Sequence, residues 1–100
     1  MTIRVLHIDD DARFAELVAK YLSQNGMVVT HAPDGGRGLA VLERADVDVV
    51  LLDVMMPGID GFETCRRIKA QAELADIPVL FMTALSDSEH VVEGFAAGGI

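Results

Sequence analysis

Aspartate residues follow two of the apolar stretches in this 100-residue chain. Asp9, Asp10 and Asp11 come directly after residues 3–8, and Asp53 comes directly after another apolar stretch. Each acid alone has an ordinary explanation, because aspartate often starts turns and caps helices. Carboxylates brought close together repel one another, and a hard divalent cation such as Mg²⁺ relieves that repulsion. If the fold brings these acids together, we expect them to bind Mg²⁺.

A threonine and a small residue occupy the same kind of position further along the chain. Thr83 and Ala84 directly follow a third apolar stretch, residues 78–82. Alone, Thr83 would be an ordinary β-branched strand residue. Its place at the end of an expected strand, like that of Asp53, makes it a candidate site residue.

Short continuous apolar runs alternate with helical spacings along the whole chain, and this pattern predicts the elements that carry the acids. The expected strands are residues 3–8, 27–31, 47–52 and 78–82. Their continuous apolar character is typical of strands that are buried on both faces of a parallel sheet.

Helices are expected between these strands and after the last one. The residues expected to begin them are Asp11, Asp34, Asp60 and Ser86. Glu63 and Glu89 stand three residues after the last two, which is the capping-box spacing. The side chains expected to form apolar helix faces are Phe14, Leu17, Val18, Tyr21, Leu22, Leu39, Leu42, Phe62, Cys65, Ile68, Val91, Val92, Phe95 and Ala96. Glycines at 26 and at 98–99 are expected to end the first and last helices.

The order strand–helix, repeated four times, predicts an α/β fold, a doubly wound parallel sheet with helices on both faces. Ligand sites in such folds lie at the carboxyl ends of the strands, where the strand order reverses. The candidate residues above all fall at such strand ends.

Composition limits the classes of function. The formal net charge of −8 argues against binding nucleic acid through its phosphates, which needs clustered basic residues. No apolar run approaches the roughly 20 residues of a membrane-spanning helix, and the first residues lack the pattern of a signal peptide. With a single cysteine, Cys65, no internal disulfide can form. We therefore expect one cytoplasmic domain that binds neither nucleic acid nor membrane.

Three segments together resemble the receiver domain of bacterial two-component response regulators. They are residues 5–11 (VLHIDDD), 51–61 (LLDVMMPGIDG) and 78–84 (PVLFMTA). The resemblance runs from Ile3 to Ile100. It implies a flavodoxin-like fold with strand order 2-1-3-4, used as a phosphorylation-controlled signalling switch rather than as a conventional enzyme.

The resemblance also implies a role for each metal-site residue. Asp53 is similar to the phosphoacceptor that takes a phosphoryl group from a sensor histidine kinase or phosphotransfer protein. Asp10 and Asp53 resemble direct Mg²⁺ ligands, Asp9 a ligand through water, and Met55 a ligand through its backbone carbonyl.

The resemblance assigns the last two candidates to the switch. Thr83 resembles the hydroxyl that turns toward the phosphoryl group after transfer, and Ala84 resembles the small residue that leaves it room.

The family normally continues with a fifth strand that ends in a lysine, and with a fifth helix. We therefore expect residues 1–100 to be a receiver domain that is incomplete at its carboxyl end. The strand at 78–82 would then be an apolar sheet edge, and such edges pair with other chains. A homodimer or a strand-exchanged assembly is expected there. Without the lysine, a pseudo-receiver that mediates protein interactions without productive phosphorylation is the alternative function.

Two other classes fit the residues less well. A metal-dependent phosphatase with an aspartyl nucleophile usually needs a second acid two residues after it, where Met55 stands. Nucleotide-binding motifs of the GxxxxGK[ST] and GxGxxG types are absent. His7, His31 and His90 show no metal-ligand spacing, so structural or exposed roles are expected for them.

Overall fold

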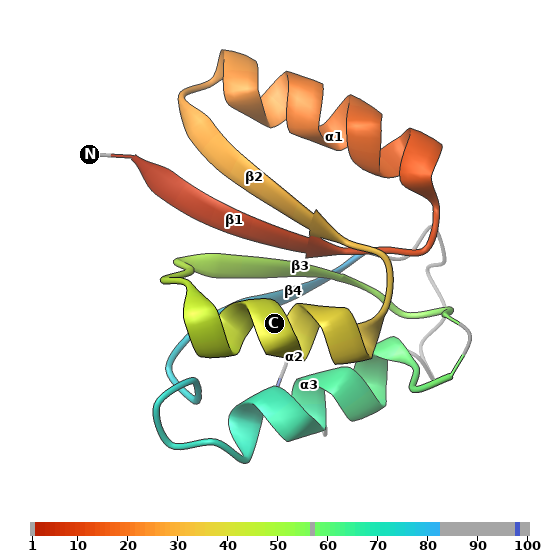
Figure 1. Cartoon of the computed structure of the whole chain (residues 1–100), viewed down its shortest axis with the longest axis vertical. Coiled ribbons are helices and arrows are strands. Elements are labelled where there is room, and N and C mark those ends of the chain that lie inside the picture. The colour runs from red at the N-terminus through yellow and green to blue at the C-terminus, as the bar shows by residue number, and fades with distance from the viewer. Residues whose placement is uncertain (1, 57, 83–97, 99–100) are drawn as a thin grey trace.

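The structure, a computed structural model, describes residues 2–56, 58–82 and 98. Its elements are β1 (Ile3–Ile8), α1 (Ala12–Gln24), β2 (Met27–Ala32), α2 (Gly35–Arg44), β3 (Val49–Asp53), α3 (Gly61–Lys69) and β4 (Val79–Met82), shown in Figure 1. The helix expected after Ser86, with its apolar residues, lies outside the described residues.

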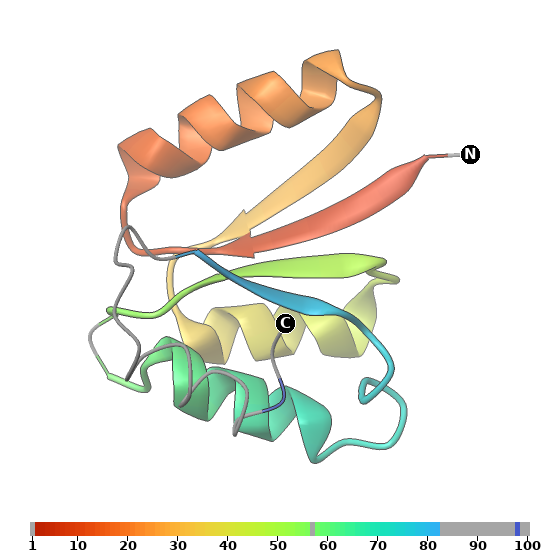
Figure 2. The ribbon, with the colours of Figure 1, turned by 180° about the vertical axis from the view of Figure 1, so that it is seen from behind.

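The four strands form one parallel sheet in the order β2-β1-β3-β4, so the predicted fold class and strand order are confirmed. Val5 is in register with Val29 of β2 and with Val49 of β3. Helix α1 lies on one face of the sheet, and α2 and α3 lie on the other (Figures 1 and 2). β2 lies on one side of β1 and β3 on the other, so the strand order reverses between β1 and β3. The carboxyl ends of these two neighbouring strands lie side by side.

β1 has its predicted bounds, and the boundaries of the other three strands differ from the predicted ones by one or two residues. β3 begins at Val49 rather than at residue 47, and its last residue is Asp53. Arg4 accounts for the later start, because its backbone and guanidinium both bond to Asp48 just before the strand. β4 begins at Val79 because Pro78 has no N–H, although the Pro78 carbonyl accepts from Val50 N at 3.0 Å.

Aspartates begin the three described helices, as predicted. The side chain of Asp11 accepts from Phe14 N at 3.0 Å, that of Asp34 from Arg37 N at 2.8 Å, and that of Asp60 from Glu63 N at 2.9 Å. Each bond satisfies one of the amide groups that a helix leaves unpaired at its amino end. The loops that leave β1 and β2 therefore turn into helices at defined residues.

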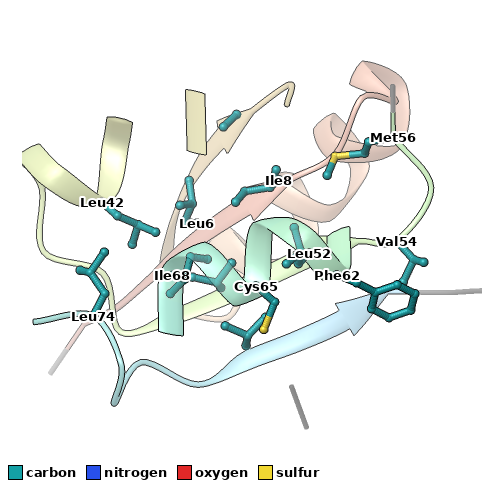
Figure 3. Packing of buried hydrophobic residues seen from close by; sticks show 13 residues of the cluster. Leu6, Ile8, Leu42, Leu52, Val54, Met56, Phe62, Cys65, Ile68 and Leu74 are labelled. Atoms are coloured by element: carbon teal, nitrogen blue, oxygen red, sulfur yellow. The ribbon is translucent and has the colours of Figure 1, made fainter. Parts of the chain in front are cut away.

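The main hydrophobic core fills the space between the sheet and the two helices α2 and α3 (Figure 3). Leu6 and Ile8 of β1 and Leu52 of β3 point into it and are fully buried. Its members are Leu6, Ile8, Ala32, Leu42, Val50, Leu52, Val54, Met56, Phe62, Cys65, Ile68, Leu74 and Val79. The predicted inner face of α3 is confirmed by this cluster.

The opposite face of the sheet is less covered within the described part of the chain. Ala15 is the buried residue of α1 there, whereas Leu17 and Tyr21 are 65% and 67% exposed. The apolar face predicted for this helix is confirmed, and much of it is exposed in the described part of the chain. None of the helices in residues 2–56 and 58–82 combines the length and apolar character needed to cross a bilayer.

Candidate functional site

Three predicted acids meet at the carboxyl ends of β1 and β3. The two strands pair up to Ile8 and Leu52, so the residues that follow them leave the sheet side by side. One carboxylate oxygen each from Asp9, Asp10 and Asp53 lies within 4.8 Å of the others. The sequence prediction that these acids converge is therefore confirmed.

The acids line a cleft of about 520 Å³ at this edge of the sheet. Its lining residues are Asp9, Asp10, Asp11, Phe14, Asp53, Phe81 and Met82. Phe14, at the start of α1, and Phe81 and Met82, at the end of β4, give it an apolar wall that the sequence analysis had not assigned to the site. The apolar wall excludes water from one side of the acids, so their charges interact more strongly than they would in bulk water.

Every polar atom of Asp9 contacts a partner. Its N–H donates to Ala32 O at 3.0 Å, which extends the bonding between β1 and β2 by one residue. Its carboxylate Oδ1 accepts from Asp11 N at 2.9 Å, and its carbonyl lies 2.7 Å from His31 Nε2. Its Oδ2 lies 3.2 Å from His7 Nε2. Asp9 is only 4% exposed, so this carboxylate is held in one orientation.

His7 was expected to be structural or exposed, and the structure places it buried beside the site. It is fully buried on β1, in register with His31 of β2, and its ring stands edge-on to Phe14 at 6.0 Å between centroids. Burial lowers the pKa of His7, and the nearby Asp9 charge opposes that effect only in part. The sequence carried one signal for this placement: residues i and i+2 of a strand face the same side, so His7 shares its side with Asp9.

Asp53 ends β3 and is half-buried in the cleft. Burial raises the pKa of its carboxyl group, and the negative charge of Asp9 raises it further. Met55 N approaches Asp53 Oδ1 at 3.4 Å, and this contact works in the opposite direction. The Asp53 carboxylate is thus less stable as an anion than an ordinary surface aspartate.

A hard divalent cation fits this donor set. Burial raises the pKa of Asp53, and the charges of Asp9 and Asp10 raise it further, so a cation bound between these acids would stabilise the charged form of Asp53. Mg²⁺ binds a few carboxylate oxygens and retains several waters, and the cleft is open enough for waters. Met55 has an exposed side chain, and its carbonyl stays a predicted ligand. Thr83 and Ala84 lie outside the described residues.

The fold and the site together define a class of protein. Its members are parallel α/β domains with an acidic site at the point where the strand order reverses. The family described as "Response regulator receiver domain" matches residues 5–100. The chain belongs to this family.

Curated relatives agree with this assignment. The DNA-binding dual master transcriptional regulator RpaA of Synechocystis sp. is 40% identical over 95 residues, covering 95% of this chain and 39% of RpaA. The transcriptional regulatory protein ResD of Bacillus subtilis is 37% identical, covering 95% of this chain and 38% of ResD. The chain thus spans about two-fifths of the length of these relatives.

Solved structures show the same fold. Chemotaxis protein CheY4 of Vibrio cholerae superposes with a TM-score of 0.94 at 32% identity, over 99% of this chain and 82% of that one. The N-terminal domain of a response regulator receiver protein from Methanoculleus marisnigri gives a TM-score of 0.86 at 34% identity, over 94% and 77%. The expected flavodoxin-like receiver fold is confirmed.

Proposed function

We propose that this receiver domain accepts a phosphoryl group on Asp53 with the help of Mg²⁺. The observation that carries the proposal is the meeting of Asp9, Asp10 and Asp53 within 4.8 Å in an open cleft. Asp53 is half-buried in this cleft but reachable from solvent.

The chemistry requires little covalent help from the protein. A carboxylate oxygen of Asp53 forms a bond to phosphorus while the bond from phosphorus to the donor's imidazole nitrogen breaks, and the leaving imidazole takes up a proton. Phosphoryl transfer depends on in-line positioning and on neutralisation of charge. Bound Mg²⁺ would supply positive charge to the phosphoryl oxygens. Asp10 and Asp53 are the proposed direct ligands, with Asp9 acting through a water molecule and Met55 through its carbonyl.

The modification would act as a switch. An attached phosphoryl group carries about 1.5 to 2 negative charges and replaces the single charge of the Asp53 carboxylate, so it makes a cleft that already repels anions more negative. Thr83 is proposed to turn its hydroxyl toward the new group, and Ala84 to leave space for that movement. Such a local change can bias a two-state surface, which is how a signal would leave the domain.

The proposed partners follow from this role. A sensor histidine kinase or a phosphotransfer protein is the proposed donor, in the cytoplasm. RpaA is a DNA-binding regulator by name, but the matched segment is only 39% of it. With a net charge of −8, this domain is proposed to signal to other proteins rather than to touch nucleic acid itself.

Incubation with Mg²⁺ and acetyl phosphate, followed by intact-mass measurement, tests the proposal. The wild type should gain the mass of one phosphoryl group, and Asp53→Asn should gain none. Asp76→Asn is the matched control, because Asp76 is exposed and precedes β4 at the opposite end of the sheet. Labelling of Asp53→Asn would remove Asp53 from the role. No labelling of any variant would favour the pseudo-receiver, which binds partners without being phosphorylated.

We also propose that β4 pairs with a second copy of the chain. Within the described residues β4 is hydrogen-bonded to β3 alone, and Leu80 on it is 39% exposed. Light scattering at micromolar concentration should give a mass above that of the monomer, and Leu80→Lys should lower it. A wild type that stays monomeric at these concentrations would contradict this assembly.

A further inference from the structure

His7 is an unusual residue for its position in the sheet. The other buried positions of β1 carry Val5, Leu6 and Ile8, which all have apolar side chains. Neither ring nitrogen of His7 makes a well-aligned hydrogen bond to another described residue, although the ring is fully buried. An apolar residue would avoid the cost of burying these two nitrogens. Packing alone therefore does not explain a histidine here.

One polar atom does face the ring. His7 Nε2 lies 3.2 Å from Asp9 Oδ2, which is within hydrogen-bonding range even though the alignment is imperfect. The neighbouring His31 reaches the same residue from β2, with Nε2 2.7 Å from the Asp9 carbonyl oxygen. Two in-register histidines from adjacent strands thus contact the side chain and the backbone of one acid.

We propose that His7 is a positioning residue that fixes the Asp9 carboxylate for the metal site by donating a hydrogen bond from Nε2 to Oδ2. Asp11 N already holds Oδ1 at 2.9 Å, so a donor on Oδ2 stops the carboxylate from rotating toward Asp10 or Asp53. Groups behind a metal ligand act in this way when they fix its orientation. This inference rests on the proposed Mg²⁺ site.

The chemical state of the ring agrees with this role. A neutral imidazole ring carries one proton, on either Nε2 or Nδ1. Only the tautomer with that proton on Nε2 can donate to Asp9. The second nitrogen, Nδ1, is then left as a buried acceptor, and Phe14 covers the ring edge-on.

Substitutions at His7 can distinguish a role as a hydrogen-bond donor from a role in packing alone. Glutamine carries an N–H group the same number of bonds from the backbone as His Nε2, whereas asparagine carries it one bond nearer, in the place of Nδ1. The three variants are therefore His7→Gln, His7→Asn and His7→Val. Val5→Ala is the control, because Val5 is buried on the same face of β1 but does not contact Asp9.

Mg²⁺ titration followed by amide chemical shifts gives the affinity without requiring phosphorylation. We expect His7→Val and His7→Asn to bind Mg²⁺ about tenfold more weakly than the wild type, the lower end of the 10–100-fold range for such partners. We expect His7→Gln and Val5→Ala to stay within about threefold of it. Wild-type affinity in His7→Val, or equal losses in the Gln and Asn variants, would overturn the role of His7. A wild type that does not bind Mg²⁺ would instead contradict the proposed metal site, and the role of His7 with it.

The wild-type protein provides a second measurement that does not depend on any variant folding. Long-range proton–nitrogen NMR correlations identify the tautomer of each histidine ring. His7 should carry its proton on Nε2 both with and without Mg²⁺. A proton on Nδ1 would overturn the proposal, because Nε2 would then have nothing to donate to Asp9.

Discussion

At the scale of single residues, Asp53 is an anion in surroundings that disfavour it. Its pKa is raised first by burial and then by the charge of Asp9, with a smaller contribution from Asp10. A group whose pKa is higher in the folded chain than in the unfolded chain costs stability when it is ionised. The cost is full above the folded pKa, and it vanishes below the unfolded pKa, where the group is neutral in both states.

Replacing Asp53 with asparagine should therefore stabilise the metal-free protein at neutral pH. We expect a gain on the order of 1 kcal/mol, since like charges about 4 Å apart repel by about 1 kcal/mol even in bulk water. The gain should shrink as the pH falls through the folded pKa of Asp53. Urea unfolding in EDTA at several pH values measures it, with Asp76→Asn as a control that removes the same charge from an exposed site. Equal stability of wild type and Asp53→Asn at neutral pH would contradict the repulsion.

Sequence reasoning found the acids but not the histidine. Asp9, Asp10 and Asp53 were predictable because parallel strands that end in acids bring those acids to one sheet edge. His7 has no neighbour at metal-ligand spacing, so its contact with Asp9 depends on the strand pleat and on the cover from Phe14. Such contacts between side chains require the coordinates.

At the scale of elements, Gly61 allows α3 to begin close against the end of β3, where the site lies. It begins α3 directly against the end of β3, and its N–H donates to Val54 O at 3.0 Å. A Cβ atom at this position would collide with the carbonyl oxygen of Asp53 and would lie 2.8 Å from Val54 Cα. Both are backbone atoms, so they cannot turn away as a flexible side chain would. The sequence alone shows a glycine after a helix cap, but not this close approach.

Gly61→Ala should therefore damage stability and the site together. We expect a loss of about 1–3 kcal/mol from overpacking, and weaker Mg²⁺ binding because the Asp53 backbone must move. Gly36→Ala is the matched control, since its Cβ would meet nothing closer than Asp34 Oδ1 at 3.5 Å. That change should be neutral or stabilising by up to about 1 kcal/mol, because alanine favours helix over glycine. Thermal unfolding and Mg²⁺ titration of both variants measure these effects. A Gly61→Ala protein with the melting temperature and the Mg²⁺ affinity of the wild type would refute the close approach.

The other end of the sheet is held by a pair of charged residues. Arg4 of β1 donates from its backbone N and from Nε to Asp48 Oδ2, at 2.7 and 3.1 Å, and from its guanidinium to Oδ1 at 3.1 Å. Asp48 N returns a bond to Arg4 O at 2.8 Å. This pair fixes the register of β1 and β3, and it explains why β3 begins two residues later than the apolar pattern predicts.

Asp48→Asn should lower the melting temperature at neutral pH. This decrease should become smaller as the pH is lowered. Hydrogen bonds from Arg4 hold the pKa of Asp48 below the usual value for an aspartate. A lowered pKa means stability that is present above the unfolded value and is lost as the pH falls through the folded value. The difference between wild type and variant should therefore be largest at neutral pH and smaller near pH 3. It should also shrink in 1 M salt, which screens exposed charges. A difference that does not change with pH would contradict the ionic contribution.

At the scale of the whole molecule, the main hydrophobic core and the site occupy different parts of the fold. The larger core lies between the sheet and α2 and α3, and the site lies at the strand ends, outside that core (Figure 3). The parallel sheet with helices on both faces was predictable because apolar runs and helix caps alternate regularly along the chain, whereas the strand order was implied by the resemblance to receiver domains. Periodicity shows that α1 has an apolar face but not how far other elements cover it, so the exposed fractions of that face required the coordinates.

Net charge is a property of the whole molecule that bears directly on the site. All salts screen the repulsion within a chain of net charge −8, so stability should rise with ionic strength in general. Mg²⁺ should stabilise beyond that, because a ligand that binds only the folded chain at ten times its dissociation constant adds about 1.4 kcal/mol. We therefore expect MgCl₂ to raise the melting temperature more than NaCl of equal ionic strength. Asp10→Asn should abolish the difference between the two salts, whereas Asp76→Asn should keep it, as melting curves of each variant will show. Equal effects of the two salts on the wild type would mean that the acids at the strand ends respond to ionic strength alone and do not form a metal site.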